Sequence, residues 1–217
     1  MQKLIIGIPI IVVILIAMGA VIFVFRSSTE TDRLPQFIEA DFIDLDQIYS
    51  ISKFRSGSGH DFSSGSEECR SMKHYFNTQD TREKMLSYDQ NNGIPPKPDG
   101  VNDISIYSPV NGKIIAVKSD KMPIGVQVYI RPTAYPDYTV RLFHIYLDSG
   151  VEDGSQVIAG QKIGVISQYQ NTDIAITRGW TDYISYFEVL PDHLFANYLN
   201  RENKPKKNFR TAKRACK

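Results

Sequence analysis

Residues 138–166, YTVRLFHIYLDSGVEDGSQVIAGQKIGVI, decide the fold of this chain. They contain a strand-like run that carries a histidine, then a turn, a second turn built on two glycines, and another apolar run. β-Branched and aromatic residues bounded by Gly, Asp and Ser are typical of strands joined by turns. The stretch therefore predicts half of a compact β domain.

The first of these two strands is expected to carry its histidine on a well-defined face. Successive side chains of a strand point to opposite faces. One face is expected to hold Val140, Leu142, His144 and Tyr146. The other face is expected to hold Arg141, Phe143 and Ile145. His144 would then stand among apolar side chains at the floor of a groove.

The strand pattern continues on both sides of this stretch. Runs typical of strands cover residues 104–107, 113–118, 125–131, 138–147, 161–167, 172–177 and 183–189, with a short one at Val157. Helices are expected at 35–49, at 66–76 and, closing the domain, at 191–200. The predicted class is mainly β, an antiparallel small sandwich or half-barrel with short flanking helices.

Composition and charge limit the function classes. The chain has 217 residues, 42% of them hydrophobic, which is enough for one good-sized domain with extensions. Residues 201–217 hold eight Lys and Arg and one acid, while the remainder has more acids than bases. An acidic body argues against a nucleic-acid-binding core. The basic tail is interpreted as a solvated end, with contact to anionic lipid as the alternative.

Residues 4–25 contain no charged side chain. As a helix this segment would be about 33 Å long, enough to cross the hydrocarbon core of a membrane. A cleaved signal peptide is the alternative, but its apolar region would be shorter and followed by small residues. We therefore predict a retained signal-anchor in residues 1–26 with the C-terminal domain outside the cytoplasm.

The rest of the chain divides around the β domain. Residues 27–53 are expected to form a linker with a short helix, and residues 54–200 the β domain, with a polar, Pro-containing insertion at 63–103. Residues 201–217 are the basic tail. The two cysteines, Cys69 and Cys216, would pair in an extracellular setting or remain two free thiols.

Two motifs in this order resemble a known family. Residues 108–117, SPVNGKIIAV, are followed by LFHIYL at 142–147 and VEDGSQVIAGQKIG at 151–164. The pair is similar to the lysostaphin-type, LytM-like zinc metallopeptidases, the glycyl-glycine endopeptidase family, which have the duplicated hybrid motif fold. Biotinyl and lipoyl carriers share these hairpins, but Lys121 stands in the wrong place for a carrier lysine.

The resemblance implies a zinc site that this sequence does not fully reproduce. Such hydrolases bind zinc through a His-x-x-x-Asp pair and the second histidine of His-x-His, and another histidine supports the attacking water. His144 matches that catalytic histidine and Asp61 the aspartate of the first pair. Gly57 and Ala175 stand where two zinc histidines are expected, with Asp173 at the first position of the His-x-His motif.

Other residues are candidates for completing the site. His60 and Asp173 could join Asp61 as metal ligands, because imidazole and carboxylate groups both bind zinc. Arg55, His74 and Tyr146 are candidates for the binding groove. His74 is also a candidate ligand, expected on a helix from which it would reach the site.

Three functions follow from these expectations. The first is a membrane-anchored, extracytoplasmic pseudoenzyme that binds a cell-envelope polymer or envelope protein in its groove. The second is an active, divergent zinc metalloendopeptidase. The third is a membrane-tethered adaptor with a lipid-contacting basic tail. No nucleic-acid partner is expected.

Overall fold

The computed structural model describes residues 34–57, 59–63, 67, 69–78, 96–120 and 124–199. The predicted anchor, the basic tail and most of the insertion lie outside these residues. Within the described part of the chain, no helix is long and apolar enough to cross a membrane. From Gln36 onward the chain forms one compact unit.

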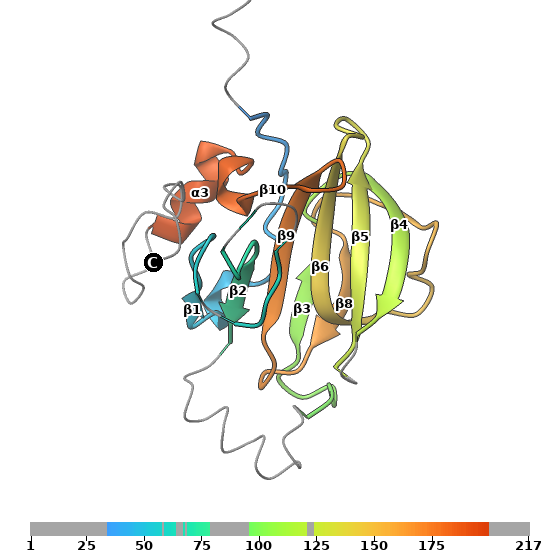
Figure 1. The fold of residues 1–217 in the computed structure, drawn as a ribbon. Coiled ribbons are helices and arrows are strands. Elements are labelled where there is room, and N and C mark those ends of the chain that lie inside the picture. The colour runs from blue at the N-terminus through green and yellow to red at the C-terminus, as the bar shows by residue number, and fades with distance from the viewer. Residues whose placement is uncertain are drawn as a thin grey trace, which may run out of the picture. The chain divides into compact units, whose positions relative to one another are not determined.

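Within the residues listed above, ten strands form a mainly antiparallel sheet (Figure 1). They are β1 (Ser50–Ile51), β2 (His74–Asn77), β3 (Ile104–Tyr107), β4 (Gly112–Ser119), β5 (Val126–Pro132), β6 (Tyr138–Leu147), β7 (Gln156–Val157), β8 (Lys162–Ile166), β9 (Thr172–Arg178) and β10 (Asp182–Ile184). The main order is β1-β2-β9-β6-β5-β4-β7. β10 pairs with β9, and β8 joins β3 to the end of β6.

The strand predictions from residue 104 to residue 177 are confirmed, and so is the closing helix, α3 (Asp192–Leu199). The last predicted strand, 183–189, is correct only in its first part. It breaks after β10 because Ser185 and Glu188 form a capping box that starts the 3-10 helix η2 (Tyr186–Glu188).

The two helices predicted near the N-terminal side are wrong. Residues 66–76 lead into β2, whose His74, Tyr75 and Phe76 pair with β9. This long-range pairing overrides the local helical pattern. Residues 35–49 contain only the 3-10 helix η1 (Leu45–Gln47). Their apolar side chains are instead buried separately, as where Phe42 packs edge-on against Phe76.

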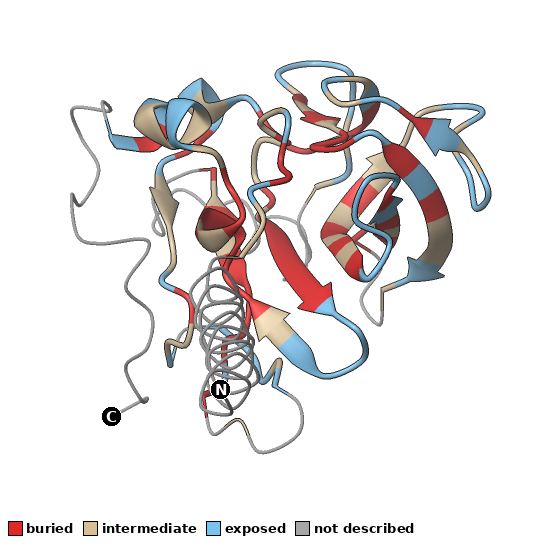
Figure 2. Cartoon of the chain, turned by 90° about the horizontal axis from the view of Figure 1, so that it is seen from above, coloured by how far each residue is buried: buried red, intermediate tan, exposed pale blue. Residues whose placement is uncertain are grey.

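Buried residues run along the strands of the sheet, as the red segments of Figure 2 show. Val140, Leu142 and Ile145 of β6 are fully buried there. β3 and β8 lie behind these strands in Figure 1 and supply further buried isoleucines. The opposite side of the same strands is therefore the face left for function.

A bulge in β6 changes the face on which its residues lie. Val126 and Val128 of β5 pair with Ile145 and Leu142, so two steps along β5 match three along β6. At the extra residue, His144 has a φ of +64°, a backbone conformation that residues other than glycine rarely adopt. The predicted strict alternation is therefore wrong. Ile145 joins Leu142 in the core, and His144 lies on the face of Phe143.

Replacing Gly125 by alanine is expected to destabilise the domain more than the same change at Gly150. Both have positive φ, so each substitution costs about 1 kcal/mol from backbone strain. A Cβ at Gly125 would also lie 2.6 Å from the carbonyl oxygen of Ile145, beside the bulge. Overpacking adds about 1 to 3 kcal/mol. Urea denaturation of both variants tests this, and equal losses would contradict it.

Candidate functional site

A buried lysine lies at the centre of the functional face. The side chain of Lys73 is 0% exposed, and its Nζ donates to Oδ2 of Asp173 at 2.6 Å. Nζ also lies 3.2 Å from Nε2 of His60. His60 Nδ1 lies 3.0 Å from the carbonyl oxygen of Asp61, which only accepts. The His60 ring therefore donates a hydrogen bond from Nδ1 and accepts a hydrogen bond from Lys73 at Nε2.

Three aromatic rings surround the same ammonium group. Nζ of Lys73 lies 4.3 Å from the ring centre of Phe143 and 4.8 Å from those of Phe62 and Tyr75. A cation over the face of an aromatic ring is attracted by the ring quadrupole, and more strongly where water is excluded. The rings thus stabilise the charge and close it off from solvent.

His144 links this lysine to a second carboxylate. Its Nε2 lies 3.2 Å from Asp173 Oδ2, and its Nδ1 lies 2.8 Å from Asp120 Oδ2. Lys73 and His144 thus face the carboxylates of Asp120 and Asp173. We call these four residues the Lys73 centre.

Asp173 is ionised within the centre. Burial would raise the pKa of its carboxyl group, but the hydrogen bond from His144 and the charge of Lys73 outweigh burial and hold the pKa below its ordinary value. Its Oδ1 is buried and has no hydrogen-bond partner among the described residues. The carboxylate therefore depends on the contacts of Oδ2.

The bulge that presents His144 is held by side chains from β9 and the turn before it. The Gln170 side-chain amide donates to the carbonyl oxygens of Ile124 and His144. The Thr172 hydroxyl donates to the carbonyl oxygen of Phe143 at 2.8 Å. These bonds satisfy backbone groups that the bulge removes from the sheet ladder.

The structure brings three of the predicted site residues together. His144, His60 and Asp173 all converge on Lys73 or its carboxylate. Asp61 does not, because its exposed side chain accepts from the Ser63 hydroxyl at 2.8 Å.

The predicted groove residues lie elsewhere. Arg55 forms an ion pair with Glu67 at 2.9 Å. Tyr146 pairs with Val165 of β8 near the end of β6. Their predicted groove role stays a prediction.

His74 lies in the core, not in the groove. It pairs with Ile174, whereas its neighbour Tyr75 pairs with Asp173, so the two side chains point to opposite faces. The ring of His74 bonds to the Ser52 carbonyl and the Ser185 hydroxyl, each at 2.9 Å. Burial lowers its pKa to about 4.

The residues present do not fit a zinc ion. Among the described residues, no three His, Cys, Asp or Glu side chains are grouped so that they could hold a metal. Both His144 nitrogens face carboxylates. The Nε2 atom of His60 faces the Lys73 ammonium, and a metal beside Lys73 would meet a like charge.

Sequence reasoning missed Lys73 and Asp120. Lys73 was hidden by the helical interpretation of residues 66–76. In an extended segment, the side chains of Lys73 and Tyr75 lie on one face. This alternation is visible in the sequence. Asp120 directly follows β4, and no motif in the sequence indicates that it would lie 2.8 Å from His144.

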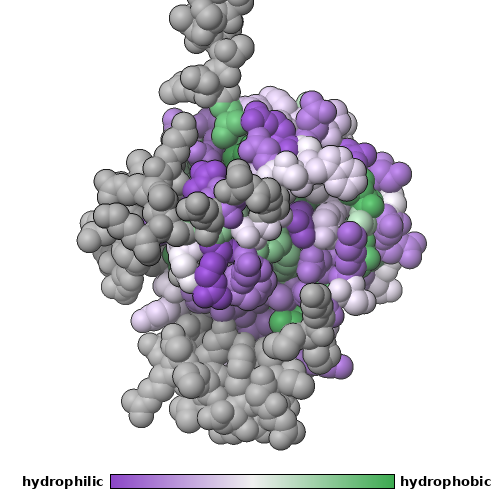
Figure 3. Space-filling model, in the orientation of Figure 1, coloured by the Kyte–Doolittle hydropathy of each residue, from purple (hydrophilic) through white to green (hydrophobic). Residues whose placement is uncertain are grey.

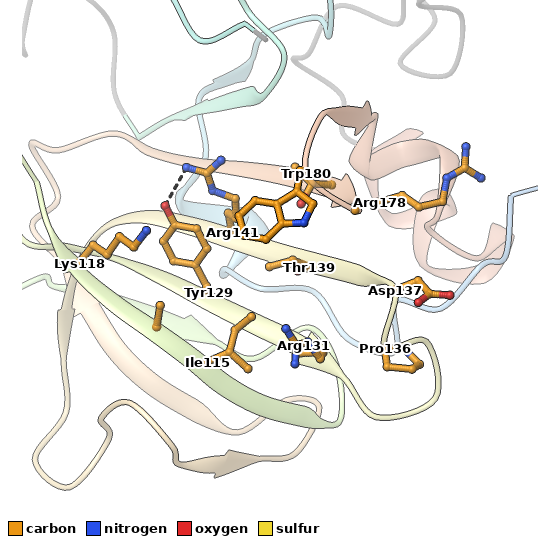
Figure 4. A pocket seen from close by; sticks show the side chains of 13 residues that line it. Ile115, Lys118, Tyr129, Arg131, Pro136, Asp137, Thr139, Arg141, Arg178 and Trp180 are labelled. Atoms are coloured by element: carbon orange, nitrogen blue, oxygen red, sulfur yellow. Dashed lines mark hydrogen bonds between the residues drawn. The ribbon is translucent and has the colours of Figure 1, made fainter. Parts of the chain in front are cut away.

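A cavity of about 710 Å³ lies on the same face, across β4, β5, β6 and β9 (Figure 4). We call it the basic groove. Its charged lining residues are Lys118, Arg131, Asp137, Arg141 and Arg178. Arg141 connects the groove with the Lys73 centre, because its guanidinium lies 5.0 Å from the ring centre of Phe62 and 5.3 Å from that of Phe143.

A second cavity of about 420 Å³ lies on the other side of the Lys73 centre and includes His60, Tyr75 and Asn171. Asn171, Asp173 and Thr177 are separated by even numbers of residues, so their side chains are expected on the same face of β9 and of the residue before it. Asn171 lines the smaller cavity and Thr177 the basic groove. The Lys73 centre therefore lies between two cavities.

Fold and site together define an antiparallel β domain with buried charged side chains beside a basic groove. No protein-family profile and no curated protein matches the chain. Solved structures with similar folds include Csd3 of Helicobacter pylori (15% identity, TM-score 0.44), covering 71% of this chain and 33% of Csd3. The chain thus spans about a third of the length of Csd3.

Two further solved structures have similar folds. A zinc-containing peptidase from Vibrio cholerae is 16% identical, with a TM-score of 0.36 and coverage of 66% of this chain and 36% of the peptidase. Lysostaphin is 17% identical, with a TM-score of 0.31, covering 52% of this chain and 50% of lysostaphin.

Proposed function

We propose that this chain is a non-catalytic, peptidase-like domain of the duplicated hybrid motif type, anchored in a membrane and exposed outside the cytoplasm. In this proposal its groove binds a cell-envelope polymer or an envelope protein. The observation that carries the proposal is Lys73, whose ammonium group lies among the residues that would have to bind a catalytic metal.

The chemistry of the centre supports binding over hydrolysis. A hydrolytic zinc site needs protein ligands with free lone pairs and an open position for water. Here the histidine nitrogens are used by Lys73 and by two carboxylates, and the ammonium is closed off by aromatic rings. The centre instead ties together the loop at His60, the segment before β2, the bulge of β6, and β9.

The proposal predicts that the full-length chain binds less than stoichiometric zinc. After incubation with zinc at neutral pH and dialysis, elemental analysis should find well under one zinc per chain. Glycine-rich peptides and cross-linked peptidoglycan should remain uncleaved. The physical reason is that the ammonium of Lys73 repels a divalent cation and occupies its donors.

The variants that decide this test are Asp173→Ala and His144→Ala, with Asp148→Ala as an exposed control. Stoichiometric zinc that is lost in both site variants and retained in the control would contradict the proposal. That result would establish the divergent metallopeptidase instead. Placement outside the cytoplasm is tested separately by protease digestion of intact cells, where protection of the C-terminal domain would contradict it.

A further inference from the structure

We propose that the basic groove binds an acidic polysaccharide through the carboxylates of its sugar acids. This inference rests on the proposed function, because it names the class of ligand for the same binding face. Three features of the groove carry it: cations without an ion-pair partner, an exposed tryptophan, and the position of the groove over the face of the sheet.

The first feature is an excess of positive charge, because Lys118, Arg131, Arg141 and Arg178 line the groove with Asp137 as its lining carboxylate. Of the groove cations, Arg178 is paired with Asp182. Its Nη2 and Nε atoms lie 2.6 Å and 2.8 Å from Oδ2 of Asp182. No such acid accompanies Lys118, Arg131 or Arg141 among the described residues. An anionic ligand would supply the missing partner, and an arginine fork matches the two oxygens of a carboxylate.

Arg141 shows the same deficit at the floor of the groove. Its guanidinium donates to the Tyr129 hydroxyl at 2.9 Å and to the Gln127 side-chain oxygen at 3.4 Å, and both are neutral groups. Its Nε is buried and has no partner among the described residues. The described residues thus leave the Arg141 guanidinium without a charged acceptor.

The second feature is the aromatic character of the groove wall. Trp180 is 98% exposed and stands in the turn between β9 and β10, beside Arg141 and Thr139 in Figure 4. Tyr129 forms part of the floor, with Lys118 Nζ 4.8 Å from its ring centre. The surrounding surface is mainly hydrophilic on the face shown in Figure 3. A flat ring among polar groups suits the apolar face of a sugar ring.

The third feature favours a polysaccharide over an acidic peptide. Extended peptides commonly bind by adding a strand to an open sheet edge. The groove lies on the face of the sheet, and its two middle strands, β5 and β6, each have a partner on both sides. Their backbone groups are already used, so recognition must come from arginine, lysine, threonine and aromatic side chains. A chain of sugar acids presents carboxylates and ring faces to such a surface.

The single tryptophan of the chain provides a direct test. We expect short galacturonic acid oligomers to change the Trp180 fluorescence of the full-length protein. Their affinity should exceed that of neutral maltooligosaccharides of equal length, and of poly-glutamate of equal charge, by about tenfold or more. Raising the ionic strength should weaken this binding, because exposed charges are screened by salt.

Variants separate the groove from general charge effects. Arg131→Gln and Lys118→Gln should each weaken galacturonate binding by about three- to tenfold, whereas Lys97→Gln, an exposed charge elsewhere, should leave it unchanged. Trp180→Phe should retain binding when measured by calorimetry, and Trp180→Ala should lose most of it. These changes are at exposed positions, which keeps the fold intact.

Three outcomes would overturn the inference: no fluorescence change with galacturonate, equal binding of the neutral oligosaccharide, or equal or tighter binding of poly-glutamate. The zinc content of the same preparation separates this failure from failure of the proposed function. Low zinc without galacturonate binding removes only the ligand assignment. Stoichiometric zinc removes the non-catalytic reading, whatever the groove binds.

Discussion

Replacing Lys73 by methionine is expected to lower the free energy of unfolding by about 3 to 5 kcal/mol. Methionine has a similar volume, so the packing against Phe62, Tyr75 and Phe143 is largely preserved. The loss comes from Asp173, whose buried carboxylate keeps only His144 as a charged partner. Urea denaturation followed by far-UV circular dichroism measures the change.

A double-mutant cycle identifies the cause of that loss. Adding Asp173→Asn to Lys73→Met removes the unpaired charge, so the double variant should recover at least half of the lost stability. Lys162→Met, which breaks the exposed pair with Asp148, should change stability by less than about 1 kcal/mol. A loss below about 1 kcal/mol for Lys73→Met would show that the centre is not a tightly coupled pair.

Acidification from pH 7 to pH 4 is expected to cost about 3 kcal/mol of stability through His74 alone. Burial lowers the pKa of His74 from 6.5 in an unfolded chain to about 4 in the folded protein. Between these values the unfolded chain takes up a proton that the folded protein excludes. The stabilisation is therefore complete above pH 6.5 and falls as the pH approaches 4.

The variant His74→Gln isolates this effect. Glutamine keeps hydrogen-bonding groups near Ser52 and Ser185 but does not titrate, so the variant should be less stable at neutral pH and depend less on pH. The difference between wild type and variant should shrink by about 3 kcal/mol between pH 7 and pH 4. His193→Gln, at an exposed position, should retain the wild-type slope. Parallel curves for wild type and His74→Gln would contradict the prediction.

Much of the fold could be predicted because the strands after residue 104 are local features. Their alternation and turn residues specify β3 to β9 almost without regard to the rest of the chain. β2 could not be found in this way, because residues 66–76 also show a helical pattern and only the pairing with β9 selects a strand. Tertiary pairing of this kind is not visible in local spacing.

The candidate site was predictable in part for the same reason. His144 was found through its motif, and Asp173 and His60 were found as substitutes for expected ligands. Lys73 was not found, because a buried ammonium is rare and its partners are distant in sequence, with Asp173 one hundred residues away. The bulge was also missed, since a single added residue in β6 leaves no clear trace in the pattern of apolar side chains.

The buried ammonium of Lys73 is a permanent part of the protein beside the basic groove. A cation that belongs to the chain is in place as soon as the chain has folded, and it requires no loading step. Chelators cannot extract it, and scarcity or competition among metals cannot change it. Arg141 and Phe62 pack against the same aromatic cluster, so their positions do not depend on a bound metal. The groove wall is thus set by folding and pH alone.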